Sequence, residues 1–290
     1  IKIPIVGISF QTSTLASIVL MVYSAKYLSK LQTLNFNLKN SLLHFWLPVF
    51  VIVLLILPSN LSTAVLLFGN VLMLAFLASY PLKYLISIII LGLISLLIFI
   101  SLARTFPEIF PNRIDTWINR IENFKTGEST DGNYQLSRAK TAIVSGKLLG
   151  LGAGKSRMKN FLPQSSSDFI YAIIVEEFGL IGGVALILLY VLLLYRIVVI
   201  SYRTKSSFGK LTVIGLGVPV VTQAFANIGV ALQVIPVTGQ NLPMISSGGT
   251  SAWVTCIAMG IILSVSSKIE SDNDLSTENN NPLNVLSEIH

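Results

Sequence analysis

Residues 84–103 are YLISIIILGLISLLIFISLA, twenty consecutive positions without a charged side chain. About 20 mostly apolar residues are what a helix needs to cross the hydrocarbon core of a bilayer. The rest of the chain has a similar character, because 53% of its 290 residues are hydrophobic, 11% are charged and the mean hydropathy is +0.75. A soluble domain carries about 25% charged residues. The composition therefore indicates an integral membrane protein and excludes the disordered, collagen-like and disulfide-rich secreted classes.

Seven segments are apolar enough to cross a membrane, and each must be helical because lipid cannot satisfy open backbone groups. The fifth is longer than a span requires, so we expect its first third to project beyond the hydrocarbon. The sequence therefore predicts an all-α polytopic membrane protein with seven transmembrane helices. These segments are residues 15–28, 42–57, 63–79, 84–103, 169–202, 211–235 and 244–265.

The distribution of Lys and Arg predicts the orientation of the chain. Basic residues gather in alternate connections, and basic connections face the cytoplasm. The short connections at 58–62 and 236–243 carry no charge. We therefore expect a transmembrane domain at 1–270, a large extracytoplasmic loop at 104–168 and a disordered cytoplasmic tail at 271–290. The basic residues that set this orientation are Lys26, Lys30, Lys39, Lys83, Arg196, Arg203, Lys205, Lys210 and Lys268.

The predicted loop holds most of the polar chemistry of the chain. It contains ten basic and six acidic residues, which gives a net charge of +4. Its segments 114–124 and 135–149 look amphipathic, and such helices commonly lie on the headgroup layer. A solvated loop held to anionic lipid is therefore the plainest interpretation of its charge.

Asp168 stands at the mouth of the fifth predicted span, after Pro163 and three serines. One interpretation is structural, since Asp at a helix N-cap accepts backbone N–H bonds. The other is functional, since a carboxylate facing a polar outer cavity can act as a general base. The sequence leaves both interpretations open.

Glu176 and Glu177 follow at a depth of about 12–13 Å, given a rise of roughly 1.5 Å per residue. Acids inside a span are costly and are usually paired, so a structural ion pair with a loop Lys or Arg stands beside a functional role. Gly179, Gly182 and Gly183 come next. They suit close packing between helices.

The last two predicted spans carry a second group of polar and small residues. Gln223 and Asn227 lie on the sixth, and Ser246, Gly248 and Gly249 open the seventh. Contact between helices is the commoner explanation for such residues, and a cavity-lining irregular backbone is the alternative.

Four motifs follow one another along the chain: Ser9-Phe10-Gln11-Thr12-Ser13, residues 57–64, residues 161–179 and residues 227–251. Together they resemble the SEDS family of bacterial cell-wall proteins. The first is similar to the F-Q-P-S-E motif of that family, and the second is similar to its P-D-L-G-T-A turn. Residues 161–179, with Asp168 and the Glu176-Glu177 pair, resemble its L-P-E-x-x-T-D-F-I-F-A…E-E-L-G signature. Residues 227–251 resemble its N-I-G…P-T-G…L-P-F-I-S-Y-G-G-S-S pattern. The spacing agrees along nearly the whole chain except the tail.

The resemblance implies a ten-span fold in which the large loop joins spans seven and eight. This chain would then correspond to spans four to ten, and we expect three further spans ahead of Ile1. Some acids of the family pattern are replaced here: Thr14 and Gln164 stand where it has Glu, and Asn60 where it has Asp. Asp168 is retained, so these departures put secondary contacts in doubt rather than the central acid.

The resemblance also implies an activity, that of an inverting peptidoglycan glycosyltransferase that polymerises lipid II during cell division. In that case Asp168 is the catalytic base and Lys155, Arg157 and Lys159 supply cations for the departing diphosphate. The other residues implied to bind substrate are Gln11, Ser13, Glu176, Glu177, Gln223, Asn227, Ser246, Gly248 and Gly249.

The implied partners are lipid II, a class B penicillin-binding transpeptidase and other division proteins of the inner membrane, and no nucleic acid. No resident cofactor is predicted, and a divalent cation stays open. One cysteine, Cys256, excludes an intrachain disulfide, and two histidines cannot build a multi-His metal site. Two other functions remain open, namely a transporter that flips the lipid-linked precursor and a non-catalytic scaffold.

Overall fold

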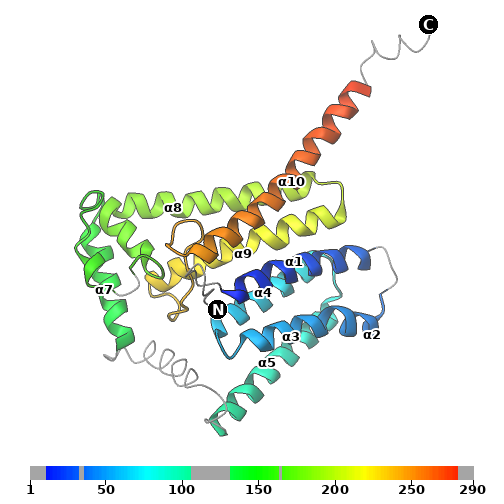
Figure 1. Ribbon diagram of the computed structural model, residues 1–290, viewed down its shortest axis with the longest axis horizontal. Coiled ribbons are helices and arrows are strands. Elements are labelled where there is room, and N and C mark those ends of the chain that lie inside the picture. Colours follow the sequence, from blue (N-terminus) through cyan, green and yellow to red (C-terminus); the bar gives the residue numbers. More distant parts are fainter. Residues whose placement is uncertain (1–10, 33–35, 106–130, 163–164, 280–290) are drawn as a thin grey trace, which may run out of the picture.

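The computed structural model describes residues 11–32, 36–105, 131–162 and 165–279, and every regular element within them is a helix. The long helices form a bundle, and α7 lies at one end of it (Figure 1). Their bounds are α1 (Thr12–Leu31), α2 (Leu38–Ser41), the π-helical turn η1 (Leu42–Trp46), α3 (Leu47–Ile56), α4 (Leu61–Leu77), α5 (Leu82–Thr105), α7 (Asp131–Gly146), the 3₁₀ turn η2 (Met158–Asn160), α8 (Ile170–Arg203), α9 (Ser207–Ala231) and α10 (Gly249–Asn279).

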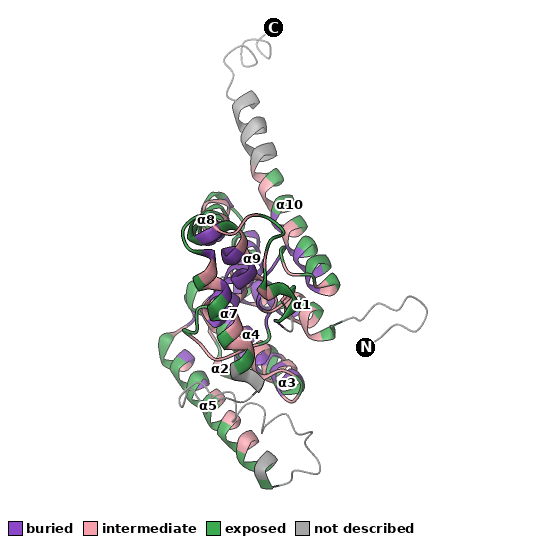
Figure 2. Ribbon diagram, turned by 90° about the vertical axis from the view of Figure 1, so that its left-hand side faces the viewer, coloured by how far each residue is buried: buried purple, intermediate pink, exposed green. Residues whose placement is uncertain are grey.

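Helix α9 is the centre of the bundle. It packs against α1, α4, α8 and α10, and 67% of its most apolar window is buried, against 11% for α5. Figure 2 shows this contrast as many buried residues on α9 and mostly exposed residues, with some intermediate ones, on α5. The apolar outer faces of the other helices are the surface that a membrane protein presents to lipid.

Each of the seven predicted spans lies mostly within a helix, which confirms the all-α class, but residues 232–235 and 244–248 lie outside α9 and α10 and the count of seven spans stays a prediction. Five helices are long and apolar enough to cross a membrane by length and composition: 38–56, 82–102, 170–203, 207–231 and 249–269. Helix α4 is apolar but has only 17 residues. In Figure 1 the connections α4–α5 and α8–α9 lie at one end of the bundle, while α3–α4, α9–α10 and α7 lie at the other.

The described residues test two expectations, one about the loop and one about the tail, only in part. The amphipathic segment predicted at 135–149 corresponds to α7, whereas 114–124 lies outside the described residues. The tail expected to be disordered from 271 is helical as far as Asn279, the end of α10. The physical reason is that residues 261–281 contain no Gly or Pro that would end the helix earlier. Residues 280–290 lie outside the described part.

Helix α8 explains why the fifth predicted span is too long. Gly179 has φ 70° and ψ −174°, so the helix breaks there into residues 170–178 and 180–203. A break within a span must have its backbone groups satisfied by protein. Here the segment after α7 supplies the partners, through Leu180 N to Lys147 O at 2.9 Å, Ile181 N to Leu148 O at 3.4 Å, Leu151 N to Glu176 O at 2.9 Å and Gly152 N to Glu177 O at 2.9 Å.

Three glycines allow the two backbones to approach this closely. A β-carbon on Gly146 would lie 2.0 Å from Val175 O, and one on Gly179 would lie 2.2 Å from Leu148 O. Gly150 has φ +80°, and its β-carbon would lie 2.2 Å from Glu177 O. The expectation that Gly179 serves helix packing is therefore wrong, because its neighbour is a loop segment and its conformation ends a helix.

Candidate functional site

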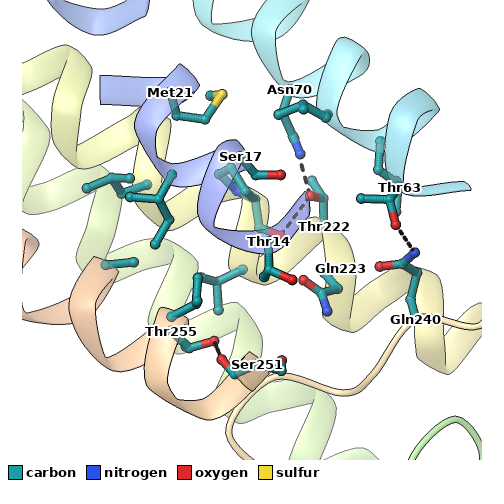
Figure 3. Close-up of a pocket in the computed structure, with 18 of the residues that line it drawn as sticks. Thr14, Ser17, Met21, Thr63, Asn70, Thr222, Gln223, Gln240, Ser251 and Thr255 are labelled. Carbon is teal, nitrogen blue, oxygen red and sulfur yellow. Dashed lines mark hydrogen bonds between the residues drawn. The ribbon is translucent and has the colours of Figure 1, made fainter. Parts of the chain in front are cut away.

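A cavity of about 150 Å³ lies inside the bundle, between α1, α4, α9, α10 and the segment 239–241. Each of these elements contributes polar side chains that point into it (Figure 3). In a membrane bundle such side chains usually face the interior or a water-filled cavity. The polar lining residues are Gln11, Thr14, Ser17, Thr63, Asn70, Thr222, Gln223, Gln240, Asn241, Ser251 and Thr255.

Hydrogen bonds across the cavity fix several of these side chains. Gln240 Nε2 donates to Thr63 Oγ1 at 2.9 Å, and Thr222 Oγ1 donates to Asn70 Oδ1 at 3.2 Å (Figure 3). Gln223 Nε2 donates to Asn241 O at 3.0 Å. These bonds tie α4 to α9 and tie both to the segment before α10, so the cavity has a defined polar wall.

Asp168 is not one of the lining residues but lies next to one of them, Gly239, at the edge of this cavity. Asp168 is half-buried. A β-carbon placed on Gly239, which lines the cavity, would lie 3.7 Å from Asp168 Oδ2. Helix α8 begins at Ile170 with Phe169 as its N-cap residue, and no side-chain cap bond is formed at that position within the described residues. Asp168 therefore stands one residue outside the N-cap, beside a polar cavity.

The turn that carries Asp168 is held through three successive carbonyls. Ser166 O accepts from Ser247 N and Oγ, both at 2.9 Å, and Ser167 O accepts from Ser246 Oγ at 2.6 Å. Asp168 O accepts from Asn227 Nδ2 at 2.8 Å. These bonds use main-chain oxygens, so they fix the turn without engaging the Asp168 carboxylate.

Asn227 and Ser246 also tie this turn to the segment before α10. Asn227 Nδ2 donates to Gln240 O at 2.7 Å, and Leu242 N donates to Ser246 Oγ at 2.7 Å. Asn227 is 1% exposed. Both residues are expected from sequence to bind substrate, and the structure places them as ties that hold the Asp168 turn against the cavity wall.

The other predicted substrate residues fall in different places. Gln11 and Gln223 line the cavity, whereas Ser13 lies on α1 and accepts a bond from Ser17 through its carbonyl at 2.8 Å. Gly249 is the first residue of α10. A β-carbon on Gly248 would lie 2.6 Å from Asn241 Nδ2, so this glycine leaves room for a cavity-lining side chain.

The predicted cations and acids lie outside the cavity lining. Lys155, Arg157 and Lys159 are exposed, on the segment that leads into and through η2. Glu177 is half-buried, and Glu176 is fully buried at 0% exposure. Among the described residues, no group of three or more His, Cys, Asp and Glu side chains could hold a metal ion.

Sequence reasoning missed Thr63, Asn70, Thr222 and Gln240, each of which forms a hydrogen bond in the cavity wall. A usable signal was present. Thr63 and Asn70 are seven residues apart on α4, so they share one helix face within an otherwise apolar segment. A polar stripe of this kind on an apolar helix indicates an interior cavity.

Comparison with known proteins matches the chain to one family over most of its length. The model of the FtsW/RodA/SpoVE family, described as cell cycle proteins, matches residues 1–271. The chain is 32% identical over 262 residues to a probable peptidoglycan glycosyltransferase FtsW of Nitrosococcus halophilus, covering 89% of this chain and 65% of that one. It is 32% identical to stage V sporulation protein E of Bacillus subtilis, with 89% and 69% covered. The chain thus spans about two thirds of the length of these relatives.

Solved structures share the fold. A chain of a peptidoglycan synthase complex that coordinates polymerization and crosslinking aligns with a TM-score of 0.68 at 22% identity, covering 92% of this chain and 73% of that one. The rod shape determining protein RodA of Thermus thermophilus aligns with a TM-score of 0.61 at 22% identity, covering 91% and 68%.

Proposed function

Since the chain belongs to the FtsW/RodA/SpoVE family of cell cycle proteins, we propose that it is a peptidoglycan glycosyltransferase that polymerises lipid II during cell division. Relatives about 30% identical carry the name of that activity. The observation that carries the proposal is the position of Asp168, a half-buried carboxylate at the rim of a polar cavity within a membrane bundle.

The reaction assigned to this site is a direct displacement. The hydroxyl oxygen of the acceptor sugar forms a bond to the anomeric carbon of the donor, and the bond from that carbon to the lipid-linked diphosphate breaks. Asp168 takes the hydroxyl proton as general base, and the diphosphate leaves with the electron pair. One displacement inverts the anomeric centre, so no covalent enzyme intermediate is needed.

The leaving diphosphate needs positive charge as its own negative charge develops. Lys155, Arg157 and Lys159 are the candidates, because they are exposed on the segment that packs beside the start of α8. Gln11, Gln223 and the other polar residues of the cavity wall are candidates for contacts with the sugars. A divalent cation stays a prediction.

The arrangement in the membrane completes the proposal. We place seven spans in the described helices, the Asp168 end of the bundle outside the cytoplasmic membrane and the C-terminus in the cytoplasm. A class B penicillin-binding transpeptidase is the proposed partner, together with other division proteins. A structural relative belongs to a peptidoglycan synthase complex, which supports a partner of this kind.

The direct test replaces Asp168→Asn in the full-length protein and measures glycan strands made from lipid II. Loss of a general base lowers the rate by about 10²- to 10⁴-fold, and folding should be retained because the turn is held by main-chain bonds. Ser166→Ala is the matched control in the same turn, since only the carbonyl of Ser166 accepts the bonds from Ser247. Normal strand synthesis by the Asp168 variant would remove this carboxylate from the mechanism.

A polar cavity inside the bundle also suits the transport alternative, in which the chain moves the lipid-linked precursor across the membrane. Proteoliposomes that contain the same full-length protein separate the two. Translocation of lipid II without polymerisation would favour the transporter, and neither activity would favour the scaffold.

A further inference from the structure

Glu176 is the one acidic side chain among the described residues that is fully buried, at 0% exposure. Removing a carboxylate from water is costly unless hydrogen bonds compensate for the lost hydration. The groups that donate hydrogen bonds to Glu176 therefore indicate which part of the protein this carboxylate holds in place.

Four donors surround the Glu176 carboxylate, and within the described residues all of them are neutral. None is the Lys or Arg side chain of the ion pair that the sequence offered as one of two interpretations. A carboxylate has about four lone-pair sites, so these donors occupy its capacity and leave no free face for a substrate. The contacts are from Ser145 Oγ to Oε1 at 3.3 Å, from Ser156 Oγ to Oε2, from Arg157 N to Oε1 at 3.1 Å and from Met158 N to both oxygens at 3.3 Å.

The two backbone donors stand at the start of η2. Amides at the start of a helical turn point outward and attract an anion, and here the anion comes from α8. Ser156 reinforces the arrangement, because its Oγ also accepts from Lys159 N at 3.1 Å. We call Glu176 with Ser145, Ser156, Arg157 and Met158 the Glu176 anchor.

The anchor fixes a segment whose cations face outward. Met158 packs against the buried cluster that contains Leu162, Phe169 and Ala172. Arg157 and Lys159 flank Met158 and are exposed. Because Phe169 follows Asp168 directly, the anchor holds these two cations on a segment packed beside the proposed catalytic turn.

We propose that Glu176 is a positioning residue, whose buried carboxylate holds Arg157 and Lys159 where they bind the diphosphate of the donor lipid. This inference rests on the proposed function and replaces the prediction that Glu176 itself binds substrate. Glu176 acts through the loop segment and does not touch the reacting atoms. Its loss therefore weakens donor binding and leaves the proton transfer at Asp168 largely intact.

The test uses Glu176→Gln and Ser156→Ala in the full-length protein, with Ser137→Ala as a control outside the anchor. Ser145 and Ser137 both lie on α7 and both bond to a carbonyl three residues earlier, but only Ser145 also reaches Glu176. Ser137→Ala thus reports the effect of removing a hydroxyl from α7 outside the anchor. Gln keeps one acceptor oxygen but replaces the other by an NH₂ group and removes the negative charge, so the four donors compete for a single, weaker acceptor.

Two measurements are made on each variant: the KM and kcat for lipid II, and hydrogen–deuterium exchange of the segment 156–160. We expect the two anchor variants to raise KM about tenfold with kcat within about twofold, and to raise exchange at 157 and 158 about tenfold. The double variant Glu176→Gln/Ser156→Ala should raise KM little more than Glu176→Gln alone, because both substitutions break the same hydrogen-bond network. Ser137→Ala should match the wild type in both measurements.

Lowered kcat with unchanged KM, or unchanged exchange at 157 and 158, would overturn the proposal. If Glu176→Gln does not fold, Ser156→Ala decides alone, because it leaves the α8 sequence intact. If the wild-type protein makes no glycan, the proposed function fails separately. In that case the affinity for undecaprenyl diphosphate replaces KM, and equal affinity in wild type and variants would refute the positioning role.

Discussion

Replacing Asn227 by Asp tests whether the Asp168 turn depends on a single buried amide. The two side chains have nearly the same shape, but the substitution changes the Nδ2 donor into an acceptor. Asn227 Nδ2 donates to Asp168 O at 2.8 Å and to Gln240 O at 2.7 Å. The variant would lose both bonds and would place a third oxygen beside two carbonyls.

The size of the effect follows from those two lost bonds. A buried acceptor left without a donor costs about 1–3 kcal/mol. Gln240 is buried, whereas Asp168 is half-buried and its carbonyl recovers some hydration. We therefore expect the free energy of unfolding to fall by about 2–5 kcal/mol, and glycan synthesis to fall because the Asp168 turn is released from the cavity wall.

Equilibrium unfolding in detergent micelles measures the first effect, and strand synthesis from lipid II measures the second. Gln223→Glu is the graded comparison, since it lies one helical turn earlier on α9 and loses one donor, to Asn241 O at 3.0 Å. It should cost about half as much, about 1–2 kcal/mol. If Asn227→Asp is as stable as the wild type, or no less stable than Gln223→Glu, the reasoning about the amide tie is wrong.

Three more substitutions probe the packing around the site. Gly150→Ala should destabilise the fold by well over the ~1–2 kcal/mol of positive-φ strain, because its β-carbon would lie 2.2 Å from a carbonyl oxygen. Gly154 has φ +75°, and a β-carbon there would meet nothing within 4 Å. Gly154→Ala should therefore show the strain alone in the same unfolding assay. Ser246→Ala removes a donor to Ser167 O and should cost about 1–2 kcal/mol and lower kcat, and a variant with wild-type kcat would contradict its role in holding the turn. Thr63→Val removes the acceptor for Gln240 Nε2 and should cost about 1 kcal/mol in thermal unfolding, and unchanged stability would contradict a role of this bond in the cavity wall.

The helices were predictable from sequence because lipid imposes one rule on every span. Apolar runs of about 20 residues must be helical, and the charge pattern then fixes which connections share an end. The excess length of the fifth segment was visible too, but its cause was not. The sequence suggests that Gly179 serves close packing between helices. The structure shows instead that α8 breaks at Gly179 and that the backbone around the break bonds to the segment after α7.

The position of Asp168 was predictable, and its surroundings were only partly so. A family motif marks the residue, and its place before a span marks the membrane surface. The four hydrogen bonds to three carbonyls that hold its turn come from residues 59 to 81 positions away along the chain. No local pattern encodes contacts of that range, so Asn227 and Ser246 were identified as important but assigned to substrate.

Glu176 is a second residue whose contacts could not be predicted from the sequence. The sequence places an acid within a span and therefore predicts a partner, and the obvious candidates are the nearby Lys and Arg residues. The partners are instead serine hydroxyls and backbone amides. Backbone donors carry no signature in the sequence, which is why their role required the structure.

The bonds from Ser247 reach the carbonyl of Ser166 and leave its exposed hydroxyl outside the contacts that hold the Asp168 turn. A main-chain attachment does not depend on which side chain stands at position 166, so this position should accept other residues while the turn keeps its shape. Variation at Ser166 with Asp168 retained therefore offers a way to change the surface beside the carboxylate without changing the scaffold.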